Sequence, residues 1–221
     1  MAHDYGVSVA QELLFRFISG KLNNQIDIKS ICFLNGGLIP DFHKPILMQK
    51  ILASKYSWIF CVLFSRPSLF MKSFSSVFGD KKPTPKELQE FWSVISYNNG
   101  FYILLLQKKI ENFLKRKKKI GRTIQGYLMQ YMAERRRNKE KWVEALRSKK
   151  VNLFLVNGPA DPVSGKHAAE ALGKLWDCEC SSYRAVNSNI VILPDEIGHY
   201  PQIEAPSLVL HFIKRFLLAQ R

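Results

Sequence analysis

The segment Val151-Asn-Leu-Phe-Leu-Val-Asn157, which Gly158-Pro159 ends, decides the fold class of this sequence. Nearly all of its residues are apolar, which is typical of a strand buried on both faces of a parallel sheet. A helix is expected at about 165–176, a further strand at 189–193 and a last helix at about 206–219. This order of strand, helix, strand and helix predicts an α/β fold, in which helices cover a parallel sheet.

The N-terminal part of the sequence continues this pattern. Residues 7–18 predict a helix, because apolar residues dominate and no Gly or Pro occurs before Gly20, and residues 27–35 predict a buried strand. Residues 42–106 contain short apolar segments broken by prolines, and the lengths of these segments favour helices. Residues 108–148 are expected to be helical and are highly charged. No glycine-rich phosphate loop occurs, which argues against a nucleotide site.

The composition is that of an ordinary globular protein. The 221 residues are 47% hydrophobic, 12% aromatic and 23% charged, which excludes a disordered tail, a collagen-like fibre and a disulfide-stapled miniprotein. The apolar runs Trp58–Phe64 and Phe101–Leu106 are far shorter than a membrane-spanning helix requires. The first residues show no apolar signal-peptide core, so we expect an intracellular location, either cytoplasmic or associated with the endoplasmic reticulum.

The cysteines predict no metal site. Only two of the four lie close together, as Cys-x-Cys, and no second pair stands at the spacing of a zinc site. We therefore expect no metal, no cofactor and four reduced thiols. These thiols belong to Cys32, Cys61, Cys178 and Cys180.

Positive charge is concentrated in one segment. The chain has a net charge of +15, from 33 Lys and Arg against 18 Asp and Glu, and residues 108–150 hold 16 of the basic residues and 4 of the acidic ones. The densest runs are Lys115–Lys119 and Arg135–Arg137. The simplest interpretation is a solvated helical face or a flexible insertion. A basic block can also attract nucleic acid or an anionic membrane surface. No nucleic-acid-binding motif occurs in the block, which argues against nucleic acid as the partner. An anionic membrane surface remains as the alternative partner.

Three residues stand where an open parallel sheet places reactive groups, near the carboxyl ends of strands. Asp4 precedes the first helix, Asp161 follows the strand at 151–157, and His199 follows the strand at 189–193. Their order along the chain matches the nucleophile, acid and base of the α/β-hydrolase fold, with aspartate in place of the usual serine.

Each of these residues also has a structural interpretation. Asp4 could cap the N-terminus of the first helix, Asp161 could be a turn residue before Pro162, and His199 could be an ordinary loop histidine. The other histidines are read as non-catalytic: His3, His43, His167 and His211.

The segment Ala2-His3-Asp4-Tyr5-Gly6 resembles the small-x-nucleophile-x-small elbow of α/β-hydrolases, in the form found in epoxide hydrolases and haloalkane dehalogenases. The resemblance implies the C-terminal part of an α/β-hydrolase fold with a helical lid. Residues 1–37 would hold the elbow, 38–148 the lid with a basic insertion near 107–125, and 149–221 the acid and base. Further segments that carry the resemblance are Val9–Leu14, Ile28–Ser30, Asn35–Gly37, Pro67–Gly79, Asn98–Gly100, Gly158–Val163 and His199–Glu204.

The resemblance also implies a chemistry. Asp4 would attack a small or lipid-like electrophile, His199 would activate the water that hydrolyses the resulting ester, and Asp161 would orient the imidazole. The backbone N–H of Tyr5 is the expected first oxyanion donor. Lid tyrosines act as proton donors in epoxide hydrolases. The sequence does not assign this role among Tyr97, Tyr102, Tyr127 and Tyr131.

The sequence departs from the family pattern at its start. The elbow lies at residue 4, so the first strands and the His-Gly-x-Pro loop with the second oxyanion donor have no counterpart in this sequence. We therefore expect a fragment or short isoform with impaired activity, whose inner strand edge has no partner. The alternative is a non-catalytic relative that acts as a binding protein.

Overall fold

A computed structural model of the chain describes residues 1–22, 26–53, 67–96, 130–184 and 188–219. Contacts divide the chain into a sheet unit, made of Met1–Lys44, Val77–Lys81 and Glu134–Arg221, and a helical unit, made of Pro45–Ser76 and Lys82–Ala133. Several features predicted above lie outside the described residues. They are Cys61, the runs Trp58–Phe64 and Phe101–Leu106, the insertion near 107–125 with Lys115–Lys119, and the tyrosines at 97, 102 and 127.

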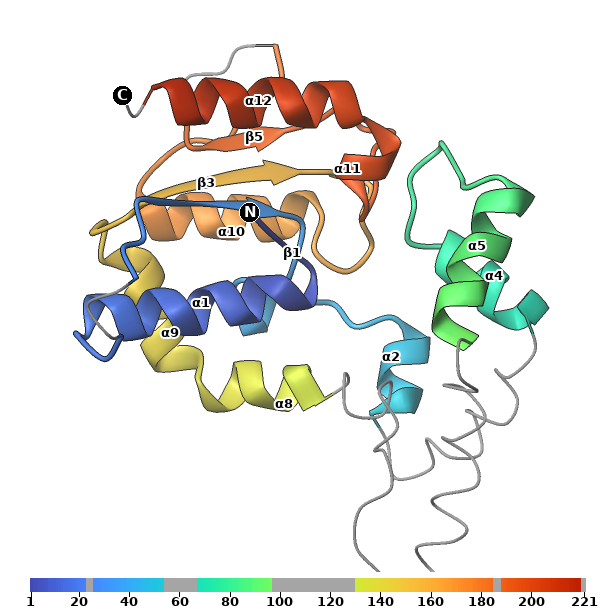
Figure 1. The fold of residues 1–221 in the computed structure, drawn as a ribbon, viewed down its shortest axis with the longest axis horizontal. Coiled ribbons are helices and arrows are strands. Elements are labelled where there is room, and N and C mark those ends of the chain that lie inside the picture. Colours follow the sequence, from blue (N-terminus) through green and yellow to red (C-terminus); the bar gives the residue numbers. More distant parts are fainter. Residues whose placement is uncertain (23–25, 54–66, 97–129, 185–187, 220–221) are drawn as a thin grey trace, which may run out of the picture. The chain divides into compact units, whose positions relative to one another are not determined.

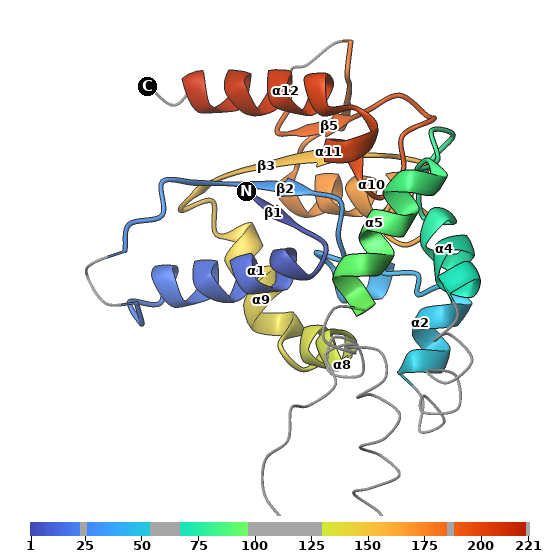
Figure 2. The same cartoon turned by 45° about the vertical axis from the view of Figure 1, so that its right-hand side comes forward.

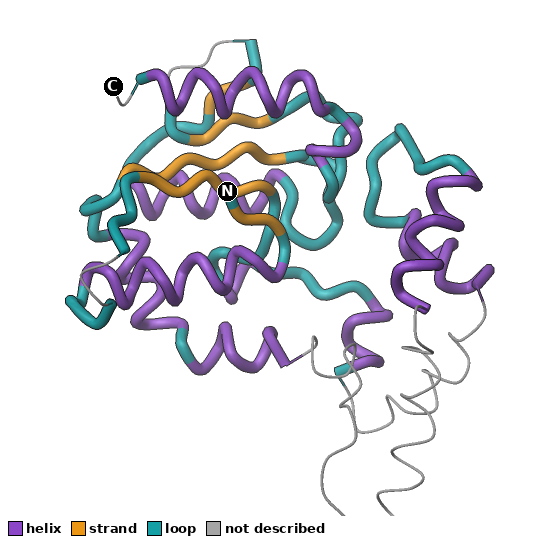
Figure 3. Tube along the Cα trace, viewed as in Figure 1, coloured by secondary structure: helices purple, strands orange, loops and turns teal. Residues whose placement is uncertain are grey.

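The sheet unit is built on a parallel sheet with the strand order β1-β2-β3-β5-β4 (Figures 1 and 3). The long pairing joins β2 to β3, from Ser30 opposite Asn152 to Leu34 opposite Val156. Figure 2 shows β2 between β1 and β3. The strands are β1 (Ala2–His3), β2 (Ser30–Leu34), β3 (Asn152–Asn157), β4 (Ser181–Ser182) and β5 (Ile190–Ile192).

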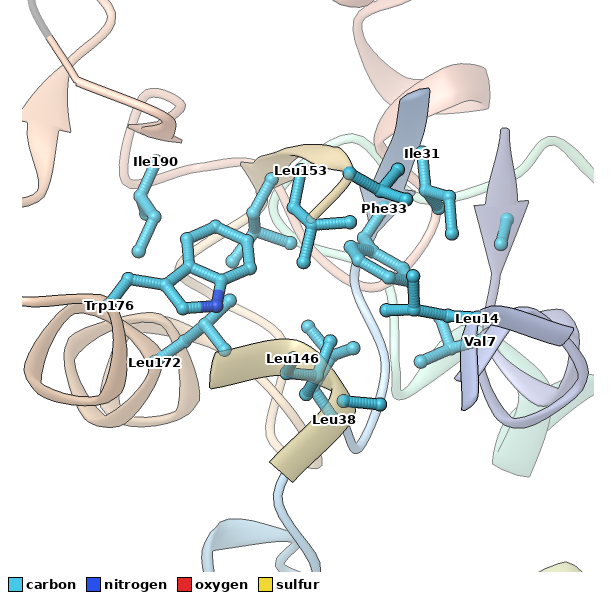
Figure 4. Packing of buried hydrophobic residues seen from close by; sticks show 14 of the residues in the cluster. Val7, Leu14, Ile31, Phe33, Leu38, Leu146, Leu153, Leu172, Trp176 and Ile190 are labelled. Atoms are coloured by element: carbon cyan, nitrogen blue, oxygen red, sulfur yellow. The ribbon is translucent and has the colours of Figure 1, made fainter. Parts of the chain in front are cut away.

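Alternate residues of β2 and β3 point to opposite faces of the sheet, and both sets are buried. On one face, Phe33 and Leu155 pack with helices α1 (Tyr5–Ile18), α9 (Lys139–Arg147) and α10 (Lys166–Trp176), as Figure 4 shows in part. On the other face, Leu34 of β2 and Val156 of β3 pack with α12 (Pro206–Leu218). Figure 1 shows α12 on one side of the sheet and α1, α9 and α10 on the other. Burial on both faces explains why β3 is apolar throughout.

Helix α1 lies against the sheet because its buried positions recur at helical spacing. Val7 and Leu14 are fully buried, and Gln11 lies between them on the same face. The Gln11 side chain donates a hydrogen bond to the backbone carbonyl of Leu38, 2.9 Å away, which satisfies its amide in the core. The helix ends at Ile18, and Gly20 follows in a left-handed conformation with φ 66°.

The helical unit contains a small aromatic cluster. Phe70 and Phe74 of α4 stack on each other with ring centroids 5.4 Å apart, and they contact Trp92 and Phe91 of α5. Prolines begin both helices, as expected for a residue without a backbone N–H. No helix within the described ranges is long and apolar enough to cross a membrane. The remaining elements are η1 (Pro40–Phe42), α2 (Leu47–Leu52), α4 (Pro67–Ser75), α5 (Pro85–Ser96), α8 (Gln130–Arg137) and α11 (Pro201–Glu204).

The structure confirms the predicted parallel sheet flanked by helices and corrects three details. The strand expected at 27–35 is shorter, since β2 begins at Ser30. The expectation that its inner edge has no partner is wrong for Phe33 and Leu34, which pair with Ala2 and His3 of β1. In the described part of 108–148 there are two helices, α8 and α9, separated at Asn138.

Candidate active site

Asp4 occupies a sharp turn between β1 and α1. Its backbone has φ 48° and ψ −113°, a conformation that an L-residue rarely adopts. Its backbone N–H donates to the carbonyl of Asn35 at 3.1 Å, and its own carbonyl accepts from Val7 at 3.2 Å. The Asp4 carboxylate makes no capping hydrogen bond to α1, so the helix-cap interpretation is wrong. The turn leaves this carboxylate 45% exposed, as a nucleophile requires.

Asp161 lies after β3 with its carboxylate fully buried. One oxygen accepts the backbone N–H of Val163 at 2.7 Å. The other accepts the Ser164 hydroxyl at 2.6 Å and the Asn35 amide at 3.0 Å. Burial alone would raise the pKa of Asp161, but these hydrogen bonds and His199 hold it well below its usual range. Asp161 therefore shapes its turn and is also an ionised acceptor.

His199 brings the two aspartates together. Its Nδ1 lies 2.7 Å from Oδ2 of Asp161, and its Nε2 lies 3.8 Å from Oδ1 of Asp4. The first is a short, charge-assisted hydrogen bond, and the second is an ion-pair distance. Burial would lower the pKa of His199, but the two carboxylates raise it to about 10. The three residues predicted as reactive thus meet in one array, with the imidazole in the middle.

The pKa of Asp4 is also shifted. Removal from water acts to raise it, whereas His199 and the guanidinium of Arg135 lower it below its ordinary value. The carboxylate is therefore ionised at neutral pH. This is the state in which it can act as a nucleophile.

The loop that carries His199 is held by a buried carboxylate, that of Glu204 in α11. One oxygen of Glu204 accepts the backbone N–H groups of Gly198 at 2.7 Å and Gly79 at 2.8 Å, and the other accepts that of Tyr200 at 3.0 Å. The backbone N–H of His199 donates a hydrogen bond to the backbone carbonyl of Val77 at 2.9 Å. In the sequence, Glu204 is only the last residue of the segment His199–Glu204 that carries the family resemblance. No local pattern indicates that its carboxylate holds this loop.

Glycines allow these loops to approach one another closely. A Cβ atom on Gly198 would overlap the backbone of Phe78 and Gly79, and one on Gly158 would overlap the carbonyl of Gly198. The segments after β3, before α11 and around residue 79 therefore meet backbone to backbone. This packing fixes the position of His199.

Aromatic rings surround the imidazole of His199. The His3 and Tyr200 rings lie at centroid distances of 5.0 Å from it, and Phe78 stacks on Tyr200 at 4.8 Å. Nε2 of His3 also lies 2.8 Å from the His199 carbonyl oxygen. His3, read from the sequence as non-catalytic, thus contacts His199, and burial lowers its own pKa.

Tyr5 is the first residue of α1, so its backbone N–H follows the Asp4 carbonyl at the elbow. Arg135 was expected on a solvated basic face, and this is wrong, since it is only 2% exposed. Arg136 and Arg137 beside it are exposed. Of the lid tyrosines, the described Tyr131 is buried and accepts a hydrogen bond from Gln49 at 3.1 Å. Among the described residues no group of His, Cys, Asp and Glu is arranged to hold a metal ion.

The chain matches no family model. It is 31% identical to the mesoderm-specific transcript protein of Mus musculus over 98% of this chain and 56% of that protein. It is 30% identical to "Putative hydrolase LipZ" of Mycobacterium tuberculosis over 93% of this chain and 60% of that protein. The chain therefore spans little more than half the length of these relatives.

Solved structures match the fold at low sequence identity. A haloalkane dehalogenase, DatA from Agrobacterium tumefaciens, aligns with a TM-score of 0.62 at 14% identity, over 99% of this chain and 65% of that one. A bacterial membrane phospholipase A aligns with a TM-score of 0.56 at 14% identity, over 99% and 56%. The chain is therefore a homologue of the mesoderm-specific transcript proteins, and it has the α/β-hydrolase fold of these solved structures.

Proposed function

We propose that the chain is a hydrolase of the epoxide-hydrolase-like branch that works through an aspartyl ester on Asp4, with small or lipid-like electrophiles as substrates. The observation that carries the proposal is the array of Asp161, His199 and Asp4, with distances of 2.7 and 3.8 Å to the two ring nitrogens. A haloalkane dehalogenase among the structural neighbours supports the choice of electrophile.

In the first step, a carboxylate oxygen of Asp4 attacks an sp³ carbon. For a haloalkane, the new C–O bond forms as the carbon–halogen bond breaks, and halide leaves with the electron pair. For an epoxide, the ring C–O bond breaks and the ring oxygen takes up a proton from solvent. No base is needed at this stage, because the pKa of Asp4 lies below its ordinary value and the carboxylate is already ionised.

The ester then changes the electrostatics around His199. Esterified Asp4 is neutral, so one of the two carboxylates that raise the pKa of His199 to about 10 is lost. The pKa of His199 must therefore fall once the ester has formed, so the imidazolium can release its proton to solvent and the neutral imidazole can act as a base. The resting charge pair and the later base thus belong to two stages of one reaction.

In the second step, His199 takes a proton from water as the water oxygen attacks the carbonyl carbon of the Asp4 ester. The negative charge on the tetrahedral oxygen is stabilised by the backbone N–H of Tyr5. Collapse breaks the bond to the alkyl oxygen, which leaves as the alcohol with a proton from His199. Asp4 is released as a carboxylic acid with one oxygen from water, and its proton passes to the neutral His199, which restores the resting carboxylate and imidazolium. Asp161 balances the imidazolium between these transfers.

The test is covalent trapping on the full chain. The protein and its D4N and H199Q variants are incubated with a panel of small epoxides and haloalkanes, and intact masses are measured. We expect H199Q to accumulate an alkyl adduct on Asp4 and D4N to accumulate none. A matched control is H211Q, since His211 is exposed on α12 away from the array.

Two outcomes would overturn the proposal. An adduct that forms equally on D4N places the reaction elsewhere in the chain. If no variant forms an adduct or releases product, while the same probes bind, the chain is the non-catalytic relative weighed above.

A further inference from the structure

We propose that Arg135, which comes from the basic segment of the chain, is a positioning residue that orients the Asp4–Tyr5 peptide group as an oxyanion donor. The inference rests on the proposed function. It assigns a role at the elbow to a residue that lies 131 positions away from Asp4 in sequence.

The guanidinium of Arg135 contacts the elbow directly. Its Nη2 donates a hydrogen bond to the backbone carbonyl of Asp4 at 2.9 Å, and its Nε donates to the hydroxyl of Ser8 at 2.7 Å. Ser8 is 3% exposed and lies one helical turn beyond Asp4. The two bonds reach the elbow and the first turn of α1 at once, so they fix one relative to the other.

The arginine fits a site shaped for it. A Cβ atom on Gly37 would overlap Nη1 of Arg135 and approach Nδ1 of His43 to 2.8 Å, so a larger residue there would have to displace the guanidinium from its present place. Burial, and then the charge of Arg135, lowers the pKa of His43 to about 4, so this neighbour is neutral at pH 7. A buried arginine is costly, and its persistence here calls for a local role.

The geometry of a peptide bond connects this contact to the chemistry. The carbonyl of Asp4 and the N–H of Tyr5 belong to one peptide group, and no cis peptide bond occurs among the described residues. In a trans peptide the two groups point in opposite directions. The carbonyl accepts from the Val7 N–H at 3.2 Å and from Arg135 at 2.9 Å, so these two donors together set the direction of the Tyr5 N–H. The charged guanidinium has the shorter contact, and it also polarises the group so that the N–H becomes a stronger donor.

The role predicts an uneven kinetic effect. Formation of the ester consumes negative charge on Asp4 and creates no oxyanion, whereas hydrolysis of the ester passes through one. Loss of an oxyanion donor costs about 10²-fold to 10³-fold in rate. We expect loss of its orientation through R135Q to slow ester hydrolysis by about 10-fold to 100-fold and ester formation by less. The adduct should accumulate in R135Q even with His199 present.

The first measurement reads the peptide group itself and needs no substrate. Asp4-Tyr5 is the one Asp-Tyr dipeptide in the sequence. Protein labelled with ¹³C-carbonyl aspartate and ¹⁵N-tyrosine therefore gives a single cross-peak that reports this bond. The peak should move in R135Q, by less in R135K, which keeps the charge but not the paired donors, and not in R136Q. Arg136 is exposed and adjacent, which makes it a matched control.

The second measurement follows adduct formation and decay by intact mass in the same variants. A shifted peak with slowed decay in R135Q and R135K supports the inference. A peak that stays in place in both variants overturns it, and so does equal slowing of both steps in R135K. If R135Q does not fold, R135K and S8A still decide the matter, since each weakens the contact without removing the charge. Failure of the proposed function has a different signature, because the unaltered chain would then form no adduct while the peak still moves.

Discussion

The imidazole of His199 is bound unequally by its two carboxylates, and this inequality sets what each aspartate does. Asp161 is fully buried and lies 2.7 Å from Nδ1, whereas Asp4 is half-exposed and lies 3.8 Å from Nε2. The buried partner therefore fixes the ring. The half-exposed partner is the one that a solvent-borne molecule can reach.

Replacement of Asp161 by asparagine should lower the pKa of His199 from about 10 towards its ordinary value of 6.5. A histidine with a raised pKa stabilises the fold below the unfolded pKa, and this stabilisation is lost as the pH rises through the folded value. The unaltered chain should thus lose stability between about pH 6.5 and 10, and D161N should lose much less. NMR titration of the ring and urea unfolding measure both effects. Asp195 is exposed, so D195N is the control.

A methyl group at Gly198 should destabilise the protein. It would overlap the backbone around Gly79, and neither loop can retreat without breaking its hydrogen bonds to Glu204. We expect G198A to lower the free energy of unfolding by about 1–3 kcal/mol, measured by urea denaturation. At Gly6 a Cβ atom meets nothing within 4 Å. G6A should leave stability unchanged or slightly raised, and equal losses in both variants would contradict the packing argument.

At the same scale, the sequence could point to the three residues of the candidate site but not to the residues that support them. Asp4, Asp161 and His199 were predicted from their places after strands and from the elbow motif, and the structure brings them together. Arg135 and Glu204 look like solvated charges in the sequence. Arg135 binds Asp4 and Ser8 far along the chain, and Glu204 binds the distant Gly79 as well as the nearby Gly198 and Tyr200. Hydrophobic periodicity reports none of these polar contacts.

At the scale of the elements, the carboxylate of Glu12 in α1 binds two side chains of α9. Glu12 accepts hydrogen bonds from the Trp142 indole at 2.6 Å and from Arg16 at 2.8 Å, and Lys141 lies 3.0 Å away. Burial would raise the pKa of Glu12, but these donors lower it from 4.5 to about 2. The ionised carboxylate therefore adds hydrogen bonds and an ion pair to the apolar core that α1 and α9 share.

The variant E12Q should lower stability by about 1–2 kcal/mol at neutral pH. Because the folded pKa lies below the unfolded one, the contribution is present above about pH 4.5 and is lost as the pH falls towards 2. The difference between E12Q and the unaltered chain should therefore shrink over this range in urea unfolding. Glu140 is exposed on α9, so E140Q serves as the control. A difference that does not change with pH would contradict the ionic role.

Element prediction succeeded where the apolar pattern was clear, β5 included, and failed for the strands of two residues. Helices α1, α10 and α12 follow the apolar periodicity and lie close to the ranges expected from it. β1 and β4 are two residues long, too short for any periodic pattern. They exist because longer neighbours offer free hydrogen-bonding edges.

For the whole molecule, the fold class could be predicted from the order of the segments. The net charge of +15 is not explained by the described residues alone. Residues 108–150 carry 16 basic and 4 acidic residues, and those up to 129 lie outside the described part. We propose that this block attracts anionic membrane surfaces. Each basic residue near such a surface contributes about 1 kcal/mol at low salt.

Vesicles that contain anionic lipid should therefore bind the chain at low ionic strength and release it as salt is added. Replacement of Lys115–Lys119 by glutamine should weaken this binding more than the removal of five exposed charges elsewhere. If both sets of substitutions weaken vesicle binding equally, net charge alone explains the binding. If the unaltered chain does not bind the vesicles, the proposal is refuted. The matched set outside the block is Lys21, Lys29, Lys174, Arg184 and Lys214.

The backbone at position 4 has a further consequence. Its φ of 48° and ψ of −113° suit glycine far better than aspartate, and such conformations cost a side-chain-bearing residue about 1–3 kcal/mol. D4G should consequently be more resistant to urea than the natural chain, by about 1 kcal/mol, although it has lost its carboxylate. Stability alone would therefore favour glycine at position 4, so stability does not explain the aspartate found there.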